Sequence, residues 1–383
     1  MKKNQSEHCK YAPSSADRWL KCPFSISDAY TGKKFVYQDK TAANKGTAMH
    51  ELCAEALEKY IAGETYESVL DKATTTLDRN IISSYVEYVS KVAGTSKDIV
   101  IYVEHRLSTM LFGVELWGTA DAVVYNSKTQ ELHIIDLKTG GIFVPSSALQ
   151  LRIYALLAVD TLVRKGQKVS EIYTHIFQPT TEGLSRMSHW TWKEISSLVP
   201  KIQEAIDASI DTPDKQVAGA HCIWCPKGLW CDAFLDKTKD SLAKAFKVFM
   251  SYQGNIERLT EDDLVAFEES RLTLEKMMRE VKNYIKKRVI DDGGAMGRLR
   301  IVEKQGARKW DDEVSAAEVL VKAGLGEDIL HIASPASVDK ILELKGDDQL
   351  RSMVQKFISR KTGSQVVKIV EPCTFEPVDT KIK

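Results

Sequence analysis

The sequence predicts a mixed α/β fold, in which a sheet is flanked by helices and followed by a helical extension and a small C-terminal module. Helical periodicity precedes and follows a group of closely spaced segments rich in Val, Ile and Tyr. From about residue 192 the helical pattern takes over. This order, helix, strands, helix, strand and then helices, is typical of a mixed sheet formed early in the chain.

The first expected helix covers residues 44–63. Residues 1–40 are expected to be irregular. The next segment, "NKGTAMHELCAEALEKYIAG", has apolar side chains at helical spacing and ends at a glycine. These side chains are Met49, Cys53, Ala56, Leu57 and Tyr60. A second, more polar helix is expected over about residues 66–93.

Strands alternate with one helix in the middle of the chain. The segments "DIVIYVEHRL", "VELWGTADAVVYN" and "ELHIIDLKTG" are separated by short turns and predict three strands of one sheet. Residues 145–166 carry helix start and stop signals, a proline with serines and a final glycine. The segments "EIYTHIFQP" and "RMSHWTW" then return to the strand pattern.

The C-terminal part is expected to form an extension and a module. Residues 255–290 predict a charged helix, and "DDGGAMG" a turn or domain boundary. Beyond it, "RLRIVEKQG" predicts a strand and residues 311–362 predict short helices. We therefore expect a domain over residues 1–240, a helical extension over 241–290 and a module over 291–383 that binds DNA or a partner.

Composition places the chain among soluble globular proteins. Lys plus Arg and Asp plus Glu both number 53 in 383 residues, so net charge favours no class of partner. No apolar run has the length of a membrane helix, and no apolar segment follows the N-terminal lysines. Seven cysteines, an odd number, are typical of a reducing compartment. These features predict a cytoplasmic protein that does not bind membranes.

The stretch "HIIDLKTGG" suggests a catalytic site. Asp136 and Lys138 stand two apart in a strand and therefore share a face, although a surface ion pair would look the same. Asp121 interrupts the preceding apolar strand, and short connections make neighbouring strands the expected outcome. His50 lies on the apolar face of its helix, where a histidine is more often part of the core.

Gln150 and Tyr154 complete the candidate set. They stand four apart on the helix after "DLKTG" and so project from one face, where an ordinary amphipathic surface is the alternative. Carboxylates and an imidazole suit a divalent cation, which polarises a phosphodiester and lowers the pKa of a bound water. A neighbouring ammonium offsets the developing charge.

The motifs resemble those of the RecB-type nucleases of the PD-(D/E)XK superfamily. The resemblance covers about residues 14–235 and rests on "GTAMHE", "GTADAVV", "IIDLKTG" and "QLRIY". It implies a restriction-endonuclease-like fold, with Mg²⁺ or Mn²⁺ held by His50, Asp121 and Asp136. It also implies that Lys138 is catalytic and that Gln150 and Tyr154 support the site and the DNA.

Two positions near these motifs need separate comment. Glu104 in "YVEHRL" resembles the acid that such nucleases often carry on their first strand, and an exposed strand glutamate is the alternative. Ala122 stands where relatives often have arginine, so one substrate or structural contact is in doubt.

The cysteines suggest a second metal site. Cys222, Cys225 and Cys231 form a C-x2-C-x5-C cluster, and Cys22 is a distant fourth ligand, with Cys9 as a rival. Four thiolates hold zinc or a [4Fe–4S] cluster, and the adjacent histidine leaves a mixed zinc site open. The pattern resembles the iron–sulfur staple of AddB-type and CRISPR-adaptation nucleases, which implies a structural [4Fe–4S] cluster. We expect Cys53 to lie in the core.

A basic stretch is a candidate path for DNA. Residues 271–309 contain 12 Lys or Arg against 5 Asp or Glu, and a solvated helix face is the alternative. The residues that we expect to contact phosphate are Arg271, Lys282, Lys286, Arg298, Arg300, Arg308 and Lys309. Trp224 and Trp230 are expected to pack around the cysteine cluster, with base stacking as the alternative.

The sequence thus predicts a Mg²⁺- or Mn²⁺-dependent DNA exonuclease. By resemblance, it would resect DNA ends in phage-type recombination, in the cytoplasm of a bacterial host, beside a single-strand annealing protein. An endonuclease or flap nuclease of the same fold and a non-catalytic, zinc-stapled DNA-binding protein are the alternatives. The sequence does not predict the polarity of digestion or the preferred DNA strand, and it allows a homo-oligomer.

Overall fold

The described part of the chain forms two compact units. The computed structural model describes residues 9–27, 41–180, 184–252, 255–303, 308–310, 319, 322, 358–360 and 365–369. The units comprise residues Met1–Glu280 and Val281–Lys383 and are described separately. The domain boundaries expected at 240 and 290 stay a prediction.

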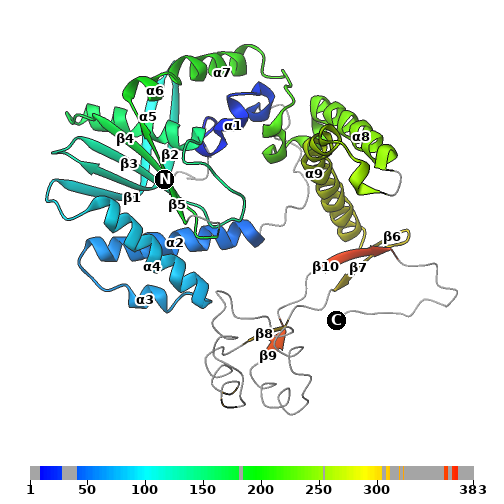
Figure 1. Cartoon of the computed structure of the whole chain (residues 1–383), viewed down its shortest axis with the longest axis horizontal. Coiled ribbons are helices and arrows are strands. Elements are labelled where there is room, and N and C mark those ends of the chain that lie inside the picture. Colours follow the sequence, from blue (N-terminus) through cyan, green and yellow to red (C-terminus); the bar gives the residue numbers. More distant parts are fainter. Residues whose placement is uncertain are drawn as a thin grey trace. The chain divides into compact units, whose positions relative to one another are not determined.

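A five-stranded mixed sheet is the centre of the first unit (Figure 1). Its strands follow the chain in order: β1 (Ile99–Leu111), β2 (Val114–Asn126), β3 (Glu131–Leu137), β4 (Glu171–Phe177) and β5 (Ser185–Trp190). Only β3 and β4 are parallel, and the other neighbours are antiparallel. The sheet confirms the predicted mixed α/β fold, because the crossover between β3 and β4 contains a helix.

Helices cover both faces of this sheet (Figure 1). The long helices of the sheet layers are α2 (Thr41–Ile61), α4 (Thr76–Ala93), α5 (Leu149–Arg164) and α7 (Val199–Asp211). Helices α2 and α4 pack against Val124 and Ile135, whereas α5 packs on the opposite face against Ile134 and Ile176. Alternate residues of β3 therefore serve two separate apolar layers, as the period of a strand requires.

The N-terminal segment differs from the expectation. Short helices η1 (Pro13–Ser15), α1 (Ala16–Trp19) and η2 (Pro23–Ile26) form where residues 1–40 were expected to be irregular. Trp19 is fully buried in the α5 layer, and its Nε1 donates to Ala12 O at 3.0 Å. Burial of three aromatic side chains, Trp19, Tyr11 and Phe24, thus holds a segment that carries no long periodic pattern.

Two helix boundaries also differ from the predictions. The helix expected over 66–93 is divided into α3 (Glu67–Leu70) and α4, because Thr75 caps α4 by accepting from Asp78 N at 3.1 Å. Helix α5 begins at Leu149 rather than at residue 145. Before it, the carbonyl of Ser146 accepts from the Thr174 hydroxyl at 2.7 Å, which ties this segment to β4. On α2, Tyr60 is exposed rather than part of the apolar face.

Helices follow β5, as expected. They are α6 (Trp192–Ser196), α7, η4 (Ala220–Trp224), η5 (Gly228–Trp230), α8 (Asp232–Tyr252), η6 (Ile256–Arg258) and α9 (Glu261–Asp291). Among the described helices, none is both long and apolar enough to span a membrane.

The second unit contains short strands. The predicted turn after residue 291 is confirmed by Gly293 and Gly294, whose φ angles of 75° and 92° few other residues adopt. β6 (Ala295–Met296), β7 (Leu299–Glu303) and β10 (Gln365–Ile369) form one sheet, and β8 (Arg308–Trp310) pairs with β9 (Ile358–Arg360). The strand expected after residue 297 is confirmed. Of the helices expected over 311–362, residues 358–360 form a strand, and nearly all others lie outside the described residues.

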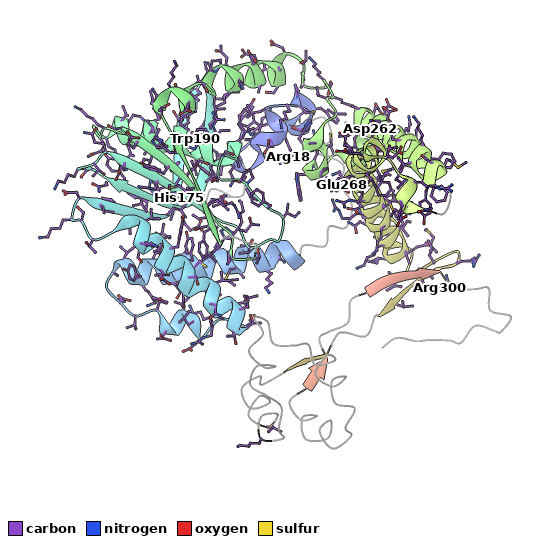
Figure 2. All side chains as sticks on the ribbon, in the orientation of Figure 1. Arg18, His175, Trp190, Asp262, Glu268 and Arg300 are labelled. Carbon is purple, nitrogen blue, oxygen red and sulfur yellow. The ribbon has the colours of Figure 1, made fainter. Side chains whose placement is uncertain are left out.

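A histidine pair spans the sheet between β3 and β4. His175, labelled in Figure 2, is buried, with Nδ1 2.9 Å from the Tyr88 hydroxyl and Nε2 3.0 Å from His133 Nδ1. Burial and, after it, the neighbouring His133 together lower the pKa of His175 to about 3. His175 is therefore neutral in the folded protein at any pH above that value.

We expect His175 to make the folding stability depend on pH. The unfolded chain takes up this proton near pH 6.5 and the folded chain does not, so stability falls by up to about 1.4 kcal/mol per pH unit below pH 6.5. Urea unfolding at pH 7.5 and 5.5 measures the loss. The His175→Gln variant should lose about 1 kcal/mol less between these pH values than the unsubstituted protein. Equal losses in the two proteins would contradict the assignment.

Candidate metal centre

The site lies where β2 and β3 diverge. The ladder of paired residues between these strands ends at Ala122 and Ile135, so the next residues, Asp121 and Asp136, lie just beyond the last pair. Beyond the last pair, the side chain of Asp121 links the two strands, because its Oδ2 accepts a hydrogen bond from Leu137 N at 2.6 Å. An aspartate in an apolar strand is thus explained by a backbone donor that would otherwise lack a partner.

Glu104 enters the site from β1 with an unusual backbone. Val103 pairs with Ala122 and His105 with Ala120, which places Glu104 opposite Asp121. The φ angle of Glu104 is 43°, in the left-handed region that costs a side-chain-bearing residue about 1–2 kcal/mol. Such an outlier persists only where its surroundings hold it, and at this place it sets two carboxylates beside each other.

Helix α2 supplies the imidazole. His50 Nδ1 lies 3.1 Å from Asp121 Oδ1, and side-chain ligand atoms of His50, Glu104 and Asp121 lie within 4.8 Å of one another. These two oxygens and one nitrogen are a donor set that suits a divalent cation. His50 is half-buried, so the alternative of a fully buried core histidine does not hold.

Asp136 and Lys138 project together, as the strand period predicts. Lys138 Nζ lies 2.7 Å from Asp136 Oδ2, and Gln150 Nε2 donates to Asp136 Oδ1 at 2.9 Å. The lysine also donates to Gln150 Oε1 at 3.3 Å. Asp136 is only 5% exposed, so the ion pair is not the solvated surface pair that the sequence allowed.

One oxygen of Asp136 is incompletely satisfied. Oδ2 is buried and, among the described residues, has no aligned hydrogen-bond donor, because its contact with Lys138 is an ion pair alone. A buried carboxylate oxygen needs a facing cation, and the Lys138 ammonium at 2.7 Å supplies one. The fit of the site to a metal ion therefore rests on the donor atoms of His50, Glu104 and Asp121, a group that does not include Asp136.

The pKa values of the site reflect burial and like charge. Burial and, after it, the negative charge of Asp121 together raise the pKa of Glu104 to about 7. Burial also raises the pKa of Asp136 to about 6, against the opposing effect of Lys138. For His50, burial lowers the pKa, but the hydrogen bond and charge of Asp121 outweigh it and the net direction is upward. Negative charge is thus crowded beyond what Lys138 and His50 offset.

Tyr154 of α5 supports the site from the buried side. It is 4% exposed, and burial raises the pKa of its hydroxyl, as do the charges of Asp136 and Asp121. A Cβ at Gly118 would lie 2.9 Å from Tyr154 Cε1 and 2.8 Å from Pro13 Cδ. The glycine of "GTADAVV" therefore lets helix α5 and the N-terminal segment approach β2, a role that the motif alone did not reveal.

The four predicted cysteine ligands gather in a separate cluster. Cys22, Cys222 and Cys231 share one apolar cluster, and Cys225 is buried nearby at the end of η4. Burial raises the pKa of Cys231, and the charges of the other three thiols raise it further, which shows that the four groups interact. Among the described residues, no three of these sulfurs lie within 4.8 Å of one another.

Backbone groups already face two of these sulfurs. Val217 N donates to Cys22 Sγ at 3.5 Å and Gly219 N donates to Cys222 Sγ at 3.3 Å. Such donors stabilise thiolates, the form that binds metal. Cys9 lies elsewhere, with Sγ 3.7 Å from Glu115 O on β2, and Cys53 is core as predicted.

Two buried lysines, which the sequence did not single out, hold the cysteine loop. Lys227 Nζ donates to Phe24 O at 2.6 Å and to the Ser27 hydroxyl at 2.9 Å. Lys276 Nζ of α9 donates to Cys225 O at 2.7 Å and pairs with Glu280 at 2.7 Å. Carbonyl oxygens around an ammonium leave no local sequence signal, because any residue can supply them.

Other side chains of this region differ from the predictions. His221 Nε2 lies 3.0 Å from Val217 O, a backbone partner that holds this ring. Trp224 is 61% exposed, so the expectation that it packs around the cysteines is wrong. In the basic stretch, Lys276 is buried and Arg271 binds Glu268 and Glu275, each at 3 Å or less. The predicted contact of Arg271 with phosphate stays a prediction, and it would have to replace these solvent-exposed ion pairs.

Comparison with known protein families shows to which family the chain belongs. A model of the family described as "Protein of unknown function (DUF2800)" matches residues 8–372. The chain belongs to the DUF2800 family. Two solved structures are similar to parts of this DUF2800 protein, "SSO0001" and "Putative exonuclease" from Eubacterium rectale.

Both structural similarities of the DUF2800 chain are distant. The first has 14% identity and a TM-score of 0.28, and covers 60% of this chain and 88% of the other. The second has 12% identity and a TM-score of 0.33, and covers 57% and 88%. At these scores the site of the DUF2800 protein has to be interpreted from its own residues.

We expect Asp121→Asn to weaken Mn²⁺ binding by at least about tenfold, because it removes one charge from the ligand set. The amide oxygen can still accept from Leu137 N, so the fold should persist. Isothermal titration calorimetry measures the affinity of each protein for Mn²⁺. Glu115→Gln, an exposed acid of the same strand, is the matched control and should bind as the unsubstituted protein does. Equal affinity in the two variants would place the metal elsewhere.

Proposed function

We propose that this protein is a Mg²⁺- or Mn²⁺-dependent deoxyribonuclease that hydrolyses phosphodiester bonds from DNA ends. The observation that carries the proposal is the meeting of Glu104, Asp121 and Asp136, from three neighbouring strands, with His50 and Lys138. A bound divalent ion would polarise the phosphate and lower the pKa of a water.

The residues around that ion have separable tasks. His50, Glu104 and Asp121 would hold it, and the resemblance adds Asp136 as a further ligand. Lys138 is held in place by Asp136 and Gln150, so that its ammonium is positioned to offset charge that develops on the phosphate. Because the lysine is fixed before substrate binds, little reorganisation is needed during the reaction.

The motif pattern supports the same proposal. The resemblance to RecB-type nucleases of the PD-(D/E)XK superfamily assigns metal binding and catalysis to the same side chains that meet here. By that resemblance, the enzyme would act in phage-type recombination or end resection, in a bacterial cytoplasm and beside a single-strand annealing protein. The exposed Lys282 and Arg298 would then contact DNA phosphates.

We expect the protein to degrade linear DNA in the presence of Mg²⁺ or Mn²⁺. Lys138→Ala and Asp136→Asn should each lower the rate at least about a hundredfold, because each removes a charge at the reacting phosphate. Lys128→Ala, in the exposed turn between β2 and β3, is the control and should leave the rate unchanged. Release of acid-soluble nucleotides measures the activity. Full activity in the Lys138 variant would rule out this site.

Covalently closed circular DNA separates the two enzymatic alternatives. An exonuclease needs an end and leaves the circle intact, whereas an endonuclease or flap nuclease of the same fold that accepts the circle cuts it. DNA binding without any cleavage would favour the non-catalytic alternative. These outcomes are read on the same gel as the linear substrate.

We also propose that Cys22, Cys222, Cys225 and Cys231 hold a structural [4Fe–4S] cluster. Cys22, Cys222 and Cys231 share one apolar cluster, and the resemblance to iron–sulfur staples favours a [4Fe–4S] cluster. A single zinc held by the same thiolates is the alternative. The cluster would link the N-terminal segment to the loop after α7, which lie about 200 residues apart in the chain.

Protein purified without oxygen should be brown and absorb near roughly 400 nm. Cys225→Ala should lose the absorbance and lower the melting temperature, because one of four ligands is missing. Cys53→Ala, a buried thiol of α2 outside the cluster, should keep the colour. Colourless protein that contains one zinc per chain would support the zinc alternative instead.

A further inference from the structure

The loop after Lys138 exposes two adjacent apolar side chains next to the candidate metal centre. Ile142 is 65% exposed and Phe143 is 61% exposed, only four and five residues beyond the lysine. Isolated apolar residues on a surface need no explanation, but a neighbouring pair beside a charged site does.

The backbone of this loop is held firmly. Gln178, at the end of β4, is fully buried, and its Nε2 donates to Gly140 O at 2.6 Å and to Ile142 O at 2.7 Å. Its Oε1 accepts from Val144 N at 3.3 Å. Burying an amide side chain to satisfy three loop groups fixes the loop in one conformation. The exposure of Phe143 is therefore built into the fold.

Arg186 of β5 completes the arrangement. Its guanidinium lies 4.4 Å from the centre of the Phe143 ring, and its Nε donates to Val144 O at 3.2 Å. Arg186 pairs with Ile176, which pairs with Asp136, so Arg186 and Asp136 share one row and one face of the sheet. Two strand spacings separate them by about 10 Å. The Arg186 cation, and the Phe143 ring that it contacts, thus lie about two strand spacings from the candidate metal centre.

We propose that Phe143, backed by Arg186, is a stacking platform for an unpaired nucleobase of the substrate. The inference rests on the proposed nuclease function and adds its substrate class, single-stranded DNA or an unpaired end. A base offers a flat face to the ring, and the guanidinium attracts the adjoining phosphate. The bases of an intact duplex are stacked on one another, so they do not present such a face to the loop.

The test uses single-stranded oligonucleotides that each carry one abasic site at a different distance from the end. In the unsubstituted protein, one abasic position should raise KM about tenfold, because the stacked base is missing there. Phe143→Ala should raise KM on the intact strand about tenfold and lose this dependence on the abasic position. Phe143→Tyr and Phe143→Trp should keep the KM and the dependence on the abasic position of the unsubstituted protein, because both side chains retain an aromatic face.

The control and the opposing outcomes separate this inference from the proposed function. Phe112→Ala, an exposed aromatic in the turn between β1 and β2, should behave as the unsubstituted protein. In one opposing outcome, cleavage depends on Lys138 while the Phe143→Ala variant keeps the KM of the unsubstituted protein and the same dependence on the abasic position. That result would contradict the stacking platform and leave the proposed nuclease function in place. Cleavage restricted to duplex DNA also overturns the platform. If no DNA is cleaved at all, both are wrong.

Discussion

The crowding of like charge at the divergence of β2 and β3 is the constraint around which the site is arranged. Three carboxylates from neighbouring strands approach one another in partly buried surroundings, where charge repulsion is poorly screened. Lys138 and Gln150 both contact Asp136, whereas His50 and the backbone N–H of Leu137 both contact Asp121. The net excess of negative charge is what makes a divalent cation the natural complement of this site.

A second constraint concerns how distant segments are held together. The N-terminal segment, the loop around Cys225 and helix α9 share a small apolar cluster, to which they contribute Phe24, Cys222 and Met277. Two buried ammonium groups also connect them through backbone carbonyls. A Cβ at Gly228 would lie 2.7 Å from Glu280 Oε2, so the loop and the helix approach closely. The four thiols of the cysteine cluster lie within the same framework.

Much of the sheet and the site could be predicted from the sequence, because both depend on short-range patterns. The alternation of side chains along β3 places Asp136 and Lys138 on one face of the strand. Helical spacing places Gln150 and Tyr154 on one face of α5. Periodicity could not reveal the short N-terminal helices, which depend on the burial of Trp19, nor the break at Thr75, which depends on a cap. The roles of Gln178 and Lys227 were invisible, since their partners are backbone carbonyls far away in the chain.

The left-handed backbone of Glu104 has a consequence for evolution and engineering. Glycine adopts a φ of 43° without the steric penalty that glutamate incurs, so the position is one where the residue with the best backbone fit lacks a carboxylate. Selection for stability alone would drift away from glutamate here. Under the proposed function the carboxylate of Glu104 is a metal ligand, so a variant stabilised by substituting this residue would lose a ligand in exchange for the stability that it gains.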